Sequence, residues 1–429
     1  MKKDKETSFL ARVILFFRGV REKLASLKIF HRISQRQRTL SSYTGKNVSE
    51  ESRISYVLGI AKIIAATVLC VLLVVTVLFG SGVISYEKVY YMFKDISYIK
   101  SFDEGAPESL SYSRPVQNQM FEGYKNGLLV ASDSEIKMFT TTGRVTLTEG
   151  SEMVNPRAST SNGYTIIYDQ GRKSFSVYNS FVKLYSERTE YPVALAAMSD
   201  NGEFLVVTSS AKYASVVKIY SNDFKLQSEL SKNERVISAS FSDNGRYAAI
   251  LTLGASGGEA QVKASVLDCD KGEVISETVF SGSMPYSCHF LTNDRIAIIL
   301  DDMAAVISKD GRIIGEYTYS ADVERIDVSG DRFVILFAGG AGNGHKQLSV
   351  FDSGCTNVFT TSVEGSVRDL ELSGGYVYVL SSKEAVRIST TLGTKTANDV
   401  YIDTVALVAF DDGRVVACSA ASGVYISFD

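Results

Sequence analysis

The sequence predicts an all-β domain, a β-propeller, preceded by a single transmembrane helix. Three observations support this prediction. An almost uninterrupted apolar run begins at Val57. After about residue 115, short strand-like runs alternate with Gly, Asn and Asp turns, without a long helical pattern. Similar groups of these strands recur at a period of about forty residues, which is typical of propeller blades.

Residues 1–56 form a basic tail. They contain thirteen Lys and Arg against five Asp and Glu, whereas 31 basic and 43 acidic residues follow Lys62. Basic segments beside a membrane span stay in the cytoplasm. The tail is therefore expected in the cytoplasm and the C-terminal domain outside it. No aromatic interleaving accompanies the basic residues, so nucleic-acid binding is not expected.

Residues 57–82 are the predicted transmembrane helix. The run from Val57 to Phe79 reads VLGIAKIIAATVLCVLLVVTVLF. At about 1.5 Å per residue it can cross a hydrocarbon layer of roughly 30 Å, and Lys62 can extend its amine to the headgroups. A cleaved signal peptide is the alternative, but this run begins too late and is too long for one. The prediction is a single-pass protein of the cell membrane, with the N-terminus in the cytoplasm.

Residues 83–114 form a connector that is polar from Ser85 to Ser113. The segment Ser97–Phe102 (SYIKSF) has the pattern of a short strand. We expect it to pair with the last strands of the chain and so to close a ring.

Residues 115–429 form the propeller, and two copies of its repeat are clear. Ala194–Leu230 and Val236–Phe280 each contain a strand, a Ser-Asp-Asn-Gly turn, a second strand, a loop and a hairpin. Gly202 and Gly245, which end these turns, can adopt the positive φ that tight hairpin turns require.

The same pattern divides the domain into eight units. They start near residues 115, 152, 191, 234, 283, 322, 365 and 400. The eighth unit has three strands, so the connector must supply its fourth. A seven-bladed ring and two packed sandwiches are the alternatives. The combination of anchor and repeats resembles an uncharacterised, single-pass, propeller-bearing family of Gram-positive bacteria, a domain of unknown function with WD40-like or quinoprotein-like repeats. This resemblance implies a location at the cell surface and no catalytic residue.

Propeller geometry predicts where a ligand binds. Turns between the first and second and the third and fourth strands of a blade lie on one face, here called the short-turn face. The other connections lie on the opposite, long-loop face. Long loops on a rigid scaffold commonly carry binding sites. They include Gly254–Ala260, Gly339–Lys346, Arg188–Pro192 and Ser281–Tyr286. The candidate binding residues on this face are Arg157, Arg188, Tyr191, Tyr213, Met284, Tyr286, His345 and Lys346.

The sequence argues against common catalytic and metal sites. The glycine-rich segment Gly339–Gly344 precedes a strand, not a phosphate-binding helix. The segment Asp268–Glu273 lacks the glutamate that a calcium loop needs at its twelfth position. His289 alternates with apolar residues and is expected to be packed. Paired acids such as Asp301-Asp302 and Asp411-Asp412 point apart or lie in solvated turns. We therefore expect no cofactor or metal, and an enzyme is disfavoured.

Four cysteines follow the anchor: Cys269, Cys288, Cys355 and Cys418. They lack metal-ligand spacing, and we interpret them as small strand residues, with an oxidised pair as the alternative. The function predicted from all these features is a binding or scaffolding module at the cell envelope, for a protein or an envelope polymer. The alternatives are a hydrolase or lyase of envelope polysaccharide and a transmembrane sensor that signals through the tail.

Overall fold

A computed structural model describes residues 62, 66, 67, 69, 109–124, 127–161, 163–339, 345–410 and 413–428. The chain divides into two compact units, Met1–Ile96 and Ser97–Asp429. Among the residues described, no helix is long and apolar enough to cross a membrane. The predicted tail, most of the predicted span and the segment 97–102 lie outside the described residues. The fold given below is that of the second unit.

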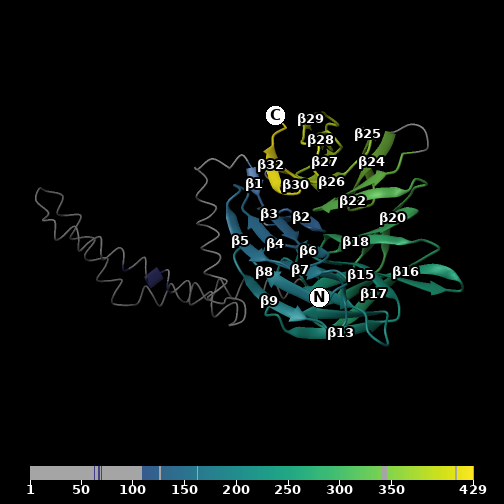
Figure 1. The fold of residues 1–429 in the computed structure, drawn as a ribbon. Coiled ribbons are helices and arrows are strands. Elements are labelled where there is room, and N and C mark those ends of the chain that lie inside the picture. The colour runs from purple at the N-terminus through teal and green to yellow at the C-terminus, as the bar shows by residue number, and fades with distance from the viewer. Residues whose placement is uncertain are drawn as a thin grey trace, which may run out of the picture. The chain divides into compact units, whose positions relative to one another are not determined.

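The described strands form eight four-stranded antiparallel sheets, the blades of one propeller (Figure 1). Blades 1 and 2 contain β2 (Gln119–Tyr124), β3 (Gly127–Ser132), β4 (Glu135–Phe139), β5 (Val145–Gly150), then β6 (Pro156–Thr160), β7 (Thr165–Asp169), β8 (Ser174–Tyr178) and β9 (Lys183–Arg188). Blades 3 and 4 contain β10 (Val193–Met198), β11 (Phe204–Thr208), β12 (Ser215–Tyr220), β13 (Leu226–Lys232), then β14 (Arg235–Phe241), β15 (Tyr247–Ser256), β16 (Glu259–Asp268) and β17 (Glu273–Ser281).

Blades 5 and 6 contain β18 (Pro285–Thr292), β19 (Arg295–Leu300), β20 (Met303–Ser308), β21 (Ile313–Thr318), then β22 (Val323–Ser329), β23 (Arg332–Phe337), β24 (His345–Asp352) and β25 (Asn357–Glu364). Blades 7 and 8 contain β26 (Asp369–Ser373), β27 (Tyr376–Leu380), β28 (Glu384–Ser389), β29 (Lys395–Asp399), then β30 (Ala406–Ala409), β31 (Val415–Cys418), β32 (Ser422–Ile426) and β1 (Ser109–Ser111). The predicted all-β, eight-bladed propeller is thus confirmed, and each predicted unit begins just before the first strand of a blade.

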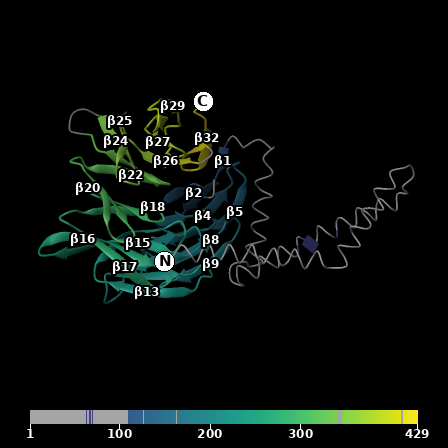
Figure 2. The same cartoon turned by 180° about the vertical axis from the view of Figure 1, so that it is seen from behind.

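The first strands of the blades form the inner wall of the ring, and β2 contacts β30 where the ring closes (Figures 1 and 2). Closure by an N-terminal strand is confirmed, but the predicted segment is wrong. The strand that pairs with β32 is β1, with Leu110 opposite Gly423. Behind it, the Tyr112 hydroxyl donates a buried hydrogen bond of 2.9 Å to the Ser419 carbonyl. Blade 8 therefore joins the two ends of the propeller.

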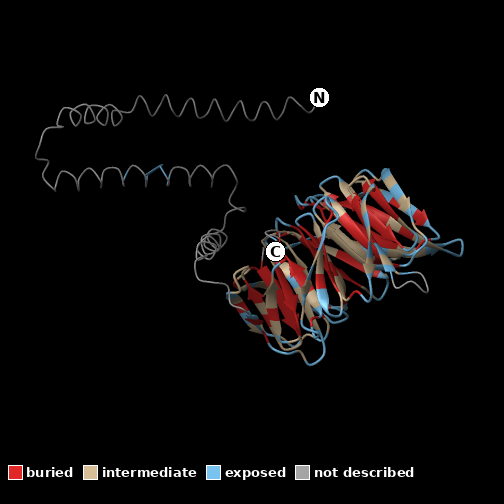
Figure 3. Ribbon diagram, turned by 90° about the horizontal axis from the view of Figure 1, so that it is seen from above, coloured by how far each residue is buried: buried red, intermediate tan, exposed pale blue. Residues whose placement is uncertain are grey.

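The hydrophobic core lies between neighbouring blades. Middle strands such as β3, β7 and β11 are buried along their whole length, whereas the outer strand β25 alternates between partly buried and exposed residues. Among the described residues, eight clusters of buried apolar side chains occur, one at each interface between blades (Figure 3). Because every blade packs on two others, the ring leaves no blade face open to water.

The repeated Ser-Asp-Asn-Gly turns have the predicted backbone. Gly202 and Gly245 have φ values of 94° and 66°. In the second turn, the Ser242 hydroxyl accepts the Tyr247 N–H at 3.0 Å. A Cβ at Gly245 would lie 2.3 Å from a carboxylate oxygen of Glu203 in blade 3. The backbone conformation therefore favours glycine here, and a larger residue would also displace the Glu203 carboxylate.

Two further details concern loops and cysteines. The segment Gly254–Ala260, predicted as a loop, instead extends β15 and β16 into a long hairpin, with only Gly257 and Gly258 between the two strands. All four cysteines that the structure describes, which are Cys269, Cys288, Cys355 and Cys418, are buried and free. Burial of these cysteines is as predicted, but only Cys288 and Cys418 lie in strands, whereas Cys269 and Cys355 lie in the turns after β16 and β24.

Candidate functional site

The predicted binding residues all belong to strand ends or connections of the long-loop face, but they do not form one cluster. Arg157 is the second residue of β6, Arg188 ends β9, and Tyr191 lies in the connection that follows β9. Residues of the other blades are Tyr213 in blade 3, Met284 and Tyr286 at the start of blade 5, and His345 and Lys346 at the start of β24.

Two of these residues have acidic neighbours on their own blade. Lys346 forms an ion pair with Glu324, and the His345 ring nitrogen Nδ1 lies 3.6 Å from Glu364. By contrast, Arg157 and Arg188 form no ion pair with any residue that the structure describes. Of the basic residues predicted to bind, the two on blade 2 are therefore the ones without an ionic partner among the described residues.

Exposed apolar side chains mark the long-loop face in a way that the predicted residues only partly captured. In the connections between blades and the adjoining strand ends, these side chains are Val116, Val154, Met284, Tyr286, Tyr401, Ile402 and Val405. By the same criterion, the turns of the short-turn face and the adjoining strand ends expose the described residues Val145, Leu226, Ile313, Ile314, Val358 and Leu392, so exposed apolar side chains occur on both faces. Tyr401 and Ile402 are 70% and 74% exposed, although large apolar side chains are usually withdrawn from water.

The connection that carries Tyr401 and Ile402 is fixed in place. The Arg368 guanidinium donates hydrogen bonds of 2.7 Å and 2.9 Å to the carbonyls of Ile402 and Thr404. The Tyr401 carbonyl also accepts the Thr404 N–H at 2.9 Å. These exposed side chains are consequently presented by an ordered loop.

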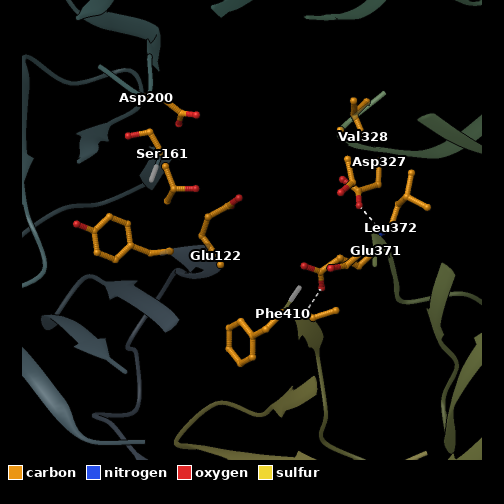
Figure 4. A pocket seen from close by; sticks show the side chains of 15 residues that line it. Glu122, Ser161, Asp200, Asp327, Val328, Glu371, Leu372 and Phe410 are labelled. Carbon is orange, nitrogen blue, oxygen red and sulfur yellow. Dashed lines mark hydrogen bonds between the residues drawn. The ribbon is translucent and has the colours of Figure 1, made fainter. Parts of the chain in front are cut away.

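The inner strands surround a central channel that the sequence analysis did not predict. Two hollows in it have volumes of about 430 and 400 Å³, and both are lined by Glu122 and Asp327. Glu371 and Asp200 line the first hollow and His289 the second. The channel is thus dominated by acidic side chains (Figure 4).

Three of the channel carboxylates connect first strands of adjacent blades. Asp327 of blade 6 accepts the Leu372 N–H at 2.5 Å. Asp369 and Glu371 of blade 7 accept the N–H groups of Leu407 and Ala409, each at 2.9 Å. Neighbouring first strands are not joined by a sheet ladder, so these side chains satisfy backbone donors that would otherwise be unpaired.

Glu122 differs from those carboxylates because it makes no hydrogen bond or ion pair with any residue in the described part of the chain. In Figure 4 it faces Glu371 and Asp327 across the first hollow. Its side chain is open to the channel, yet the walls of the ring surround it. Burial first, and then the charges of Asp327 and Asp369, raise the pKa of Glu122 to about 8. Channel solvent moderates this rise.

The pKa values of the other channel groups are also shifted so that the uncharged form is favoured. Burial raises the pKa of Asp327 to about 7, and it raises that of Asp369. Burial, followed by the charge of Asp327, raises the pKa of Glu371 well above its usual range. Burial lowers the pKa of His289 to about 4. The predicted packed role of His289 therefore needs correction: it is neutral, but it lines the channel.

The chemistry open to this channel is proton storage and attraction of cations. Within the described residues, no group of three His, Cys, Asp or Glu side chains has a metal-binding arrangement. The signal that could have revealed the channel is an acid flanked on both sides by apolar residues in a first strand, as in Ile326-Asp327-Val328 and Leu370-Glu371-Leu372. Of the paired acids considered from the sequence, Asp301 accepts the Met284 N–H at 2.7 Å, and 411–412 lie outside the described residues.

Comparisons with known proteins support the fold. The model of a family of unknown function, DUF5711, matches residues 104–420. BamB from Moraxella catarrhalis is similar in structure, with a TM-score of 0.51 and 13% identity over 74% of this chain and 98% of that one. Hsv2 from Kluyveromyces lactis has a TM-score of 0.47 and 10% identity over 67% of this chain and 98% of that one. No curated protein matches the sequence. At 13% identity, the likeness to BamB shows the fold alone.

Proposed function

This chain belongs to the DUF5711 family, whose function is unknown, and we propose that it is a membrane-anchored binding or scaffolding module at the cell envelope. In this proposal residues 57–82 span the membrane and residues 1–56 lie in the cytoplasm. The propeller lies outside the membrane and binds a partner through its long-loop face.

The observation that carries the proposal is the exposure of the adjacent side chains Tyr401 and Ile402, which at 70% and 74% are among the most exposed large apolar side chains of the described residues. The long-loop connections between blades expose aromatic and aliphatic side chains, and ordered backbone holds the most exposed of them. Isolated exposed apolar residues are ordinary, but adjacent ones held on ordered backbone are typical of an interaction surface. A rigid ring loses little conformational entropy when such a surface binds.

The direction of β1 supports the same face. Fourth strands of the blades run from the short-turn face to the long-loop face, and β1 takes the fourth place in blade 8, antiparallel to β32. The chain therefore enters the ring at Ser109 on the short-turn face. A tether that arrives there leaves the long-loop face free for a partner.

In-cell crosslinking of the intact, anchored protein tests this proposal. Residues within the long-loop connections should give recurrent crosslinks to one partner, identified by mass spectrometry. The double variant Tyr401→Ser/Ile402→Ser should weaken those crosslinks, because it removes two exposed apolar side chains without touching the core. Leu392→Ser, on the short-turn face, is the matched control and should leave them unchanged. Crosslinks confined to the short-turn face would reject the proposed binding surface.

A second candidate function, cleavage of an envelope polysaccharide, is favoured by the channel carboxylates. A carboxyl group with a raised pKa can act as a general acid near neutral pH. Glu122, whose pKa is raised to about 8, faces other carboxyl groups across the first hollow. Incubation with purified wall glycan tests this candidate: turnover that is lost in Glu122→Gln would support it, and absence of turnover by the native protein would reject it.

A further inference from the structure

Blade 2 carries a group of exposed basic side chains on the long-loop face, here called the basic patch. Its members are Arg157, Arg172, Lys173 and Arg188. The chain beyond Lys62 is acidic overall, with 43 acidic against 31 basic residues. The four basic side chains therefore place positive charge at one edge of one blade, in a domain whose net charge is negative.

Backbone pairing brings these residues together from two separate strands, β6 and β9, and the connection between β7 and β8. Arg188 of β9 pairs with Ser174 of β8, and the next N–H, that of Thr189, donates to the Lys173 carbonyl at 2.8 Å. The Arg172 carbonyl accepts the Val193 N–H at 2.7 Å. The geometry of the patch is consequently set by strand ends and not by a free loop.

Arg157 joins the patch through a neighbouring glutamine. Its Nε lies 3.4 Å from the Gln170 side-chain oxygen, and the Gln170 amide donates at 3.0 Å to the Ala194 carbonyl. Gln170 directly precedes the turn that contains Arg172. The first strand of the blade and its second-to-third connection thus contribute cations to the same edge.

No carboxylate in the described part of the chain forms an ion pair with these four side chains. Two nearby carboxylates accept hydrogen bonds from other groups. Asp169 accepts the N–H groups of Val154 and Asn155, and Glu187 accepts the hydroxyls of Tyr185 and Tyr220. Glu152 and Glu190, in the connections before and after blade 2, are exposed and form no ion pair with any described residue, and they offset two of the four positive charges.

We propose that the basic patch binds a polyanion that carries phosphate groups along an envelope polymer; this inference rests on the proposed long-loop binding face. Guanidinium groups bind phosphate oxygens through two parallel hydrogen bonds, and three of the four residues are arginines. An extended polymer can place successive phosphates over successive cations, because the patch follows the edge of a blade. Binding of this kind is electrostatic and depends strongly on salt.

An acidic polypeptide is the competing ligand, and the composition of the patch disfavours it. Protein partners draw most of their binding energy from buried aromatic and aliphatic anchors. The most exposed apolar side chains of the long-loop face, Val116, Tyr401 and Ile402, belong to connections at blades 7, 8 and 1. On blade 2 the exposed residues from Gly171 to Ser174 are small or charged.

The test is a labelling experiment on the full chain in a neutral detergent, with long-chain inorganic polyphosphate as the probe. Mass spectrometry measures how far each lysine is acetylated, so binding by the basic tail is distinguished from binding by blade 2. Polyphosphate should protect Lys173 but not Lys271, which is exposed on the short-turn face. Added salt should remove this protection.

Variants identify the cations responsible. Arg172→Gln/Arg188→Gln should raise the polyphosphate concentration that half-protects Lys173 by about fivefold or more, from the loss of two exposed ionic contacts. The matched variant Lys271→Gln/Arg312→Gln removes the same charge from the short-turn face and should leave that concentration unchanged. Unprotected Lys173, or equal effects of the two variants, would overturn the inference.

A polyglutamate probe separates the two ligand classes. Equal protection of Lys173 by polyglutamate, at the same concentration of negative charge, would replace the phosphate polymer with an acidic polypeptide and so overturn the inference. Crosslinks that depend on Tyr401 and Ile402 would persist in either case. Failure of this inference is thereby distinguishable from failure of the proposed function.

Discussion

The closing strand β1 should contribute to stability far beyond its length, and the substitution Leu110→Ala tests this. Leu110 is the middle residue of the three in β1 and is only 1% exposed. It belongs to the core cluster between blades 8 and 1, together with Leu128, Phe139 and Val416. Removing its side chain therefore affects the ring at the one interface that joins the two ends of the propeller.

The expected cost follows from the burial of this side chain. Leu→Ala removes three carbon atoms, worth about 0.8 kcal/mol each by transfer from water, or roughly 2.4 kcal/mol. A residual cavity adds to that loss, and measured values for such substitutions are about 2–5 kcal/mol. We expect a loss of about 3 kcal/mol, which for a domain of this size corresponds to a fall of roughly 4 °C in the thermal midpoint.

Thermal unfolding of the full chain in detergent, followed by far-UV circular dichroism, measures this change. Leu392→Ala is the control because Leu392 is 78% exposed on a turn, and its substitution should change stability by less than about 0.5 kcal/mol. Equal midpoints for the two variants would show that β1 does not close the ring in solution, and the assignment of the fourth strand of blade 8 would be wrong.

Three further predictions concern the channel, a turn and a cysteine. The pKa of Glu122 in the folded protein, about 8, lies above its ordinary value of 4.5. Its ionisation therefore opposes folding: the cost is fully present above pH 8 and disappears as the pH falls towards 4.5. Glu122→Gln should therefore raise the thermal midpoint at pH 9 but not at pH 4; a shift of equal size at both pH values would contradict the raised pKa. Gly245→Ala should lower the free energy of unfolding, measured by chemical denaturation, by about 1–2 kcal/mol more than Gly171→Ala does. Both glycines have positive φ, but only Gly245 faces Glu203, so equal losses would argue against that contact. Burial raises the pKa of Cys288 to about 12, so its thiol should react with a maleimide only after unfolding, and fast labelling of the native protein would refute its burial.

The blade repeat could be predicted because it is local. The Ser-Asp-Asn-Gly turns ending at Gly202 and Gly245 set the period, and burial of each second strand follows from its apolar composition. The closing strand was misplaced because Ser109–Ser111 reads SLS, a weaker strand pattern than SYIKSF at 97–102. Pairing with β32 comes from closure of the ring, and local propensity carries no information about it.

The candidate site was harder to predict because the ring itself assembles it. Glu122 and Glu371 are separated by more than half of the propeller sequence, yet both line one hollow. Their strands are first strands of blades 1 and 7, and blade 8 alone stands between them. The basic residues Arg157 and Arg188 were identified from the sequence, whereas Arg172 and Lys173 join them only through the register of blade 2.

The way in which β1 is attached has a mechanical consequence. Any tension on the chain ahead of Ser109 reaches the propeller through a ladder of only three residue pairs, Ser109 to Ser111 against Ser422 to Val424. Beyond that ladder, the bond from Tyr112 to Ser419 and the packed ring of Tyr112 form a second point of resistance. A stretched tether would thus detach β1 first and leave the other seven blades complete, so that this short strand acts as the weakest joint between a pulling force and the rest of the ring.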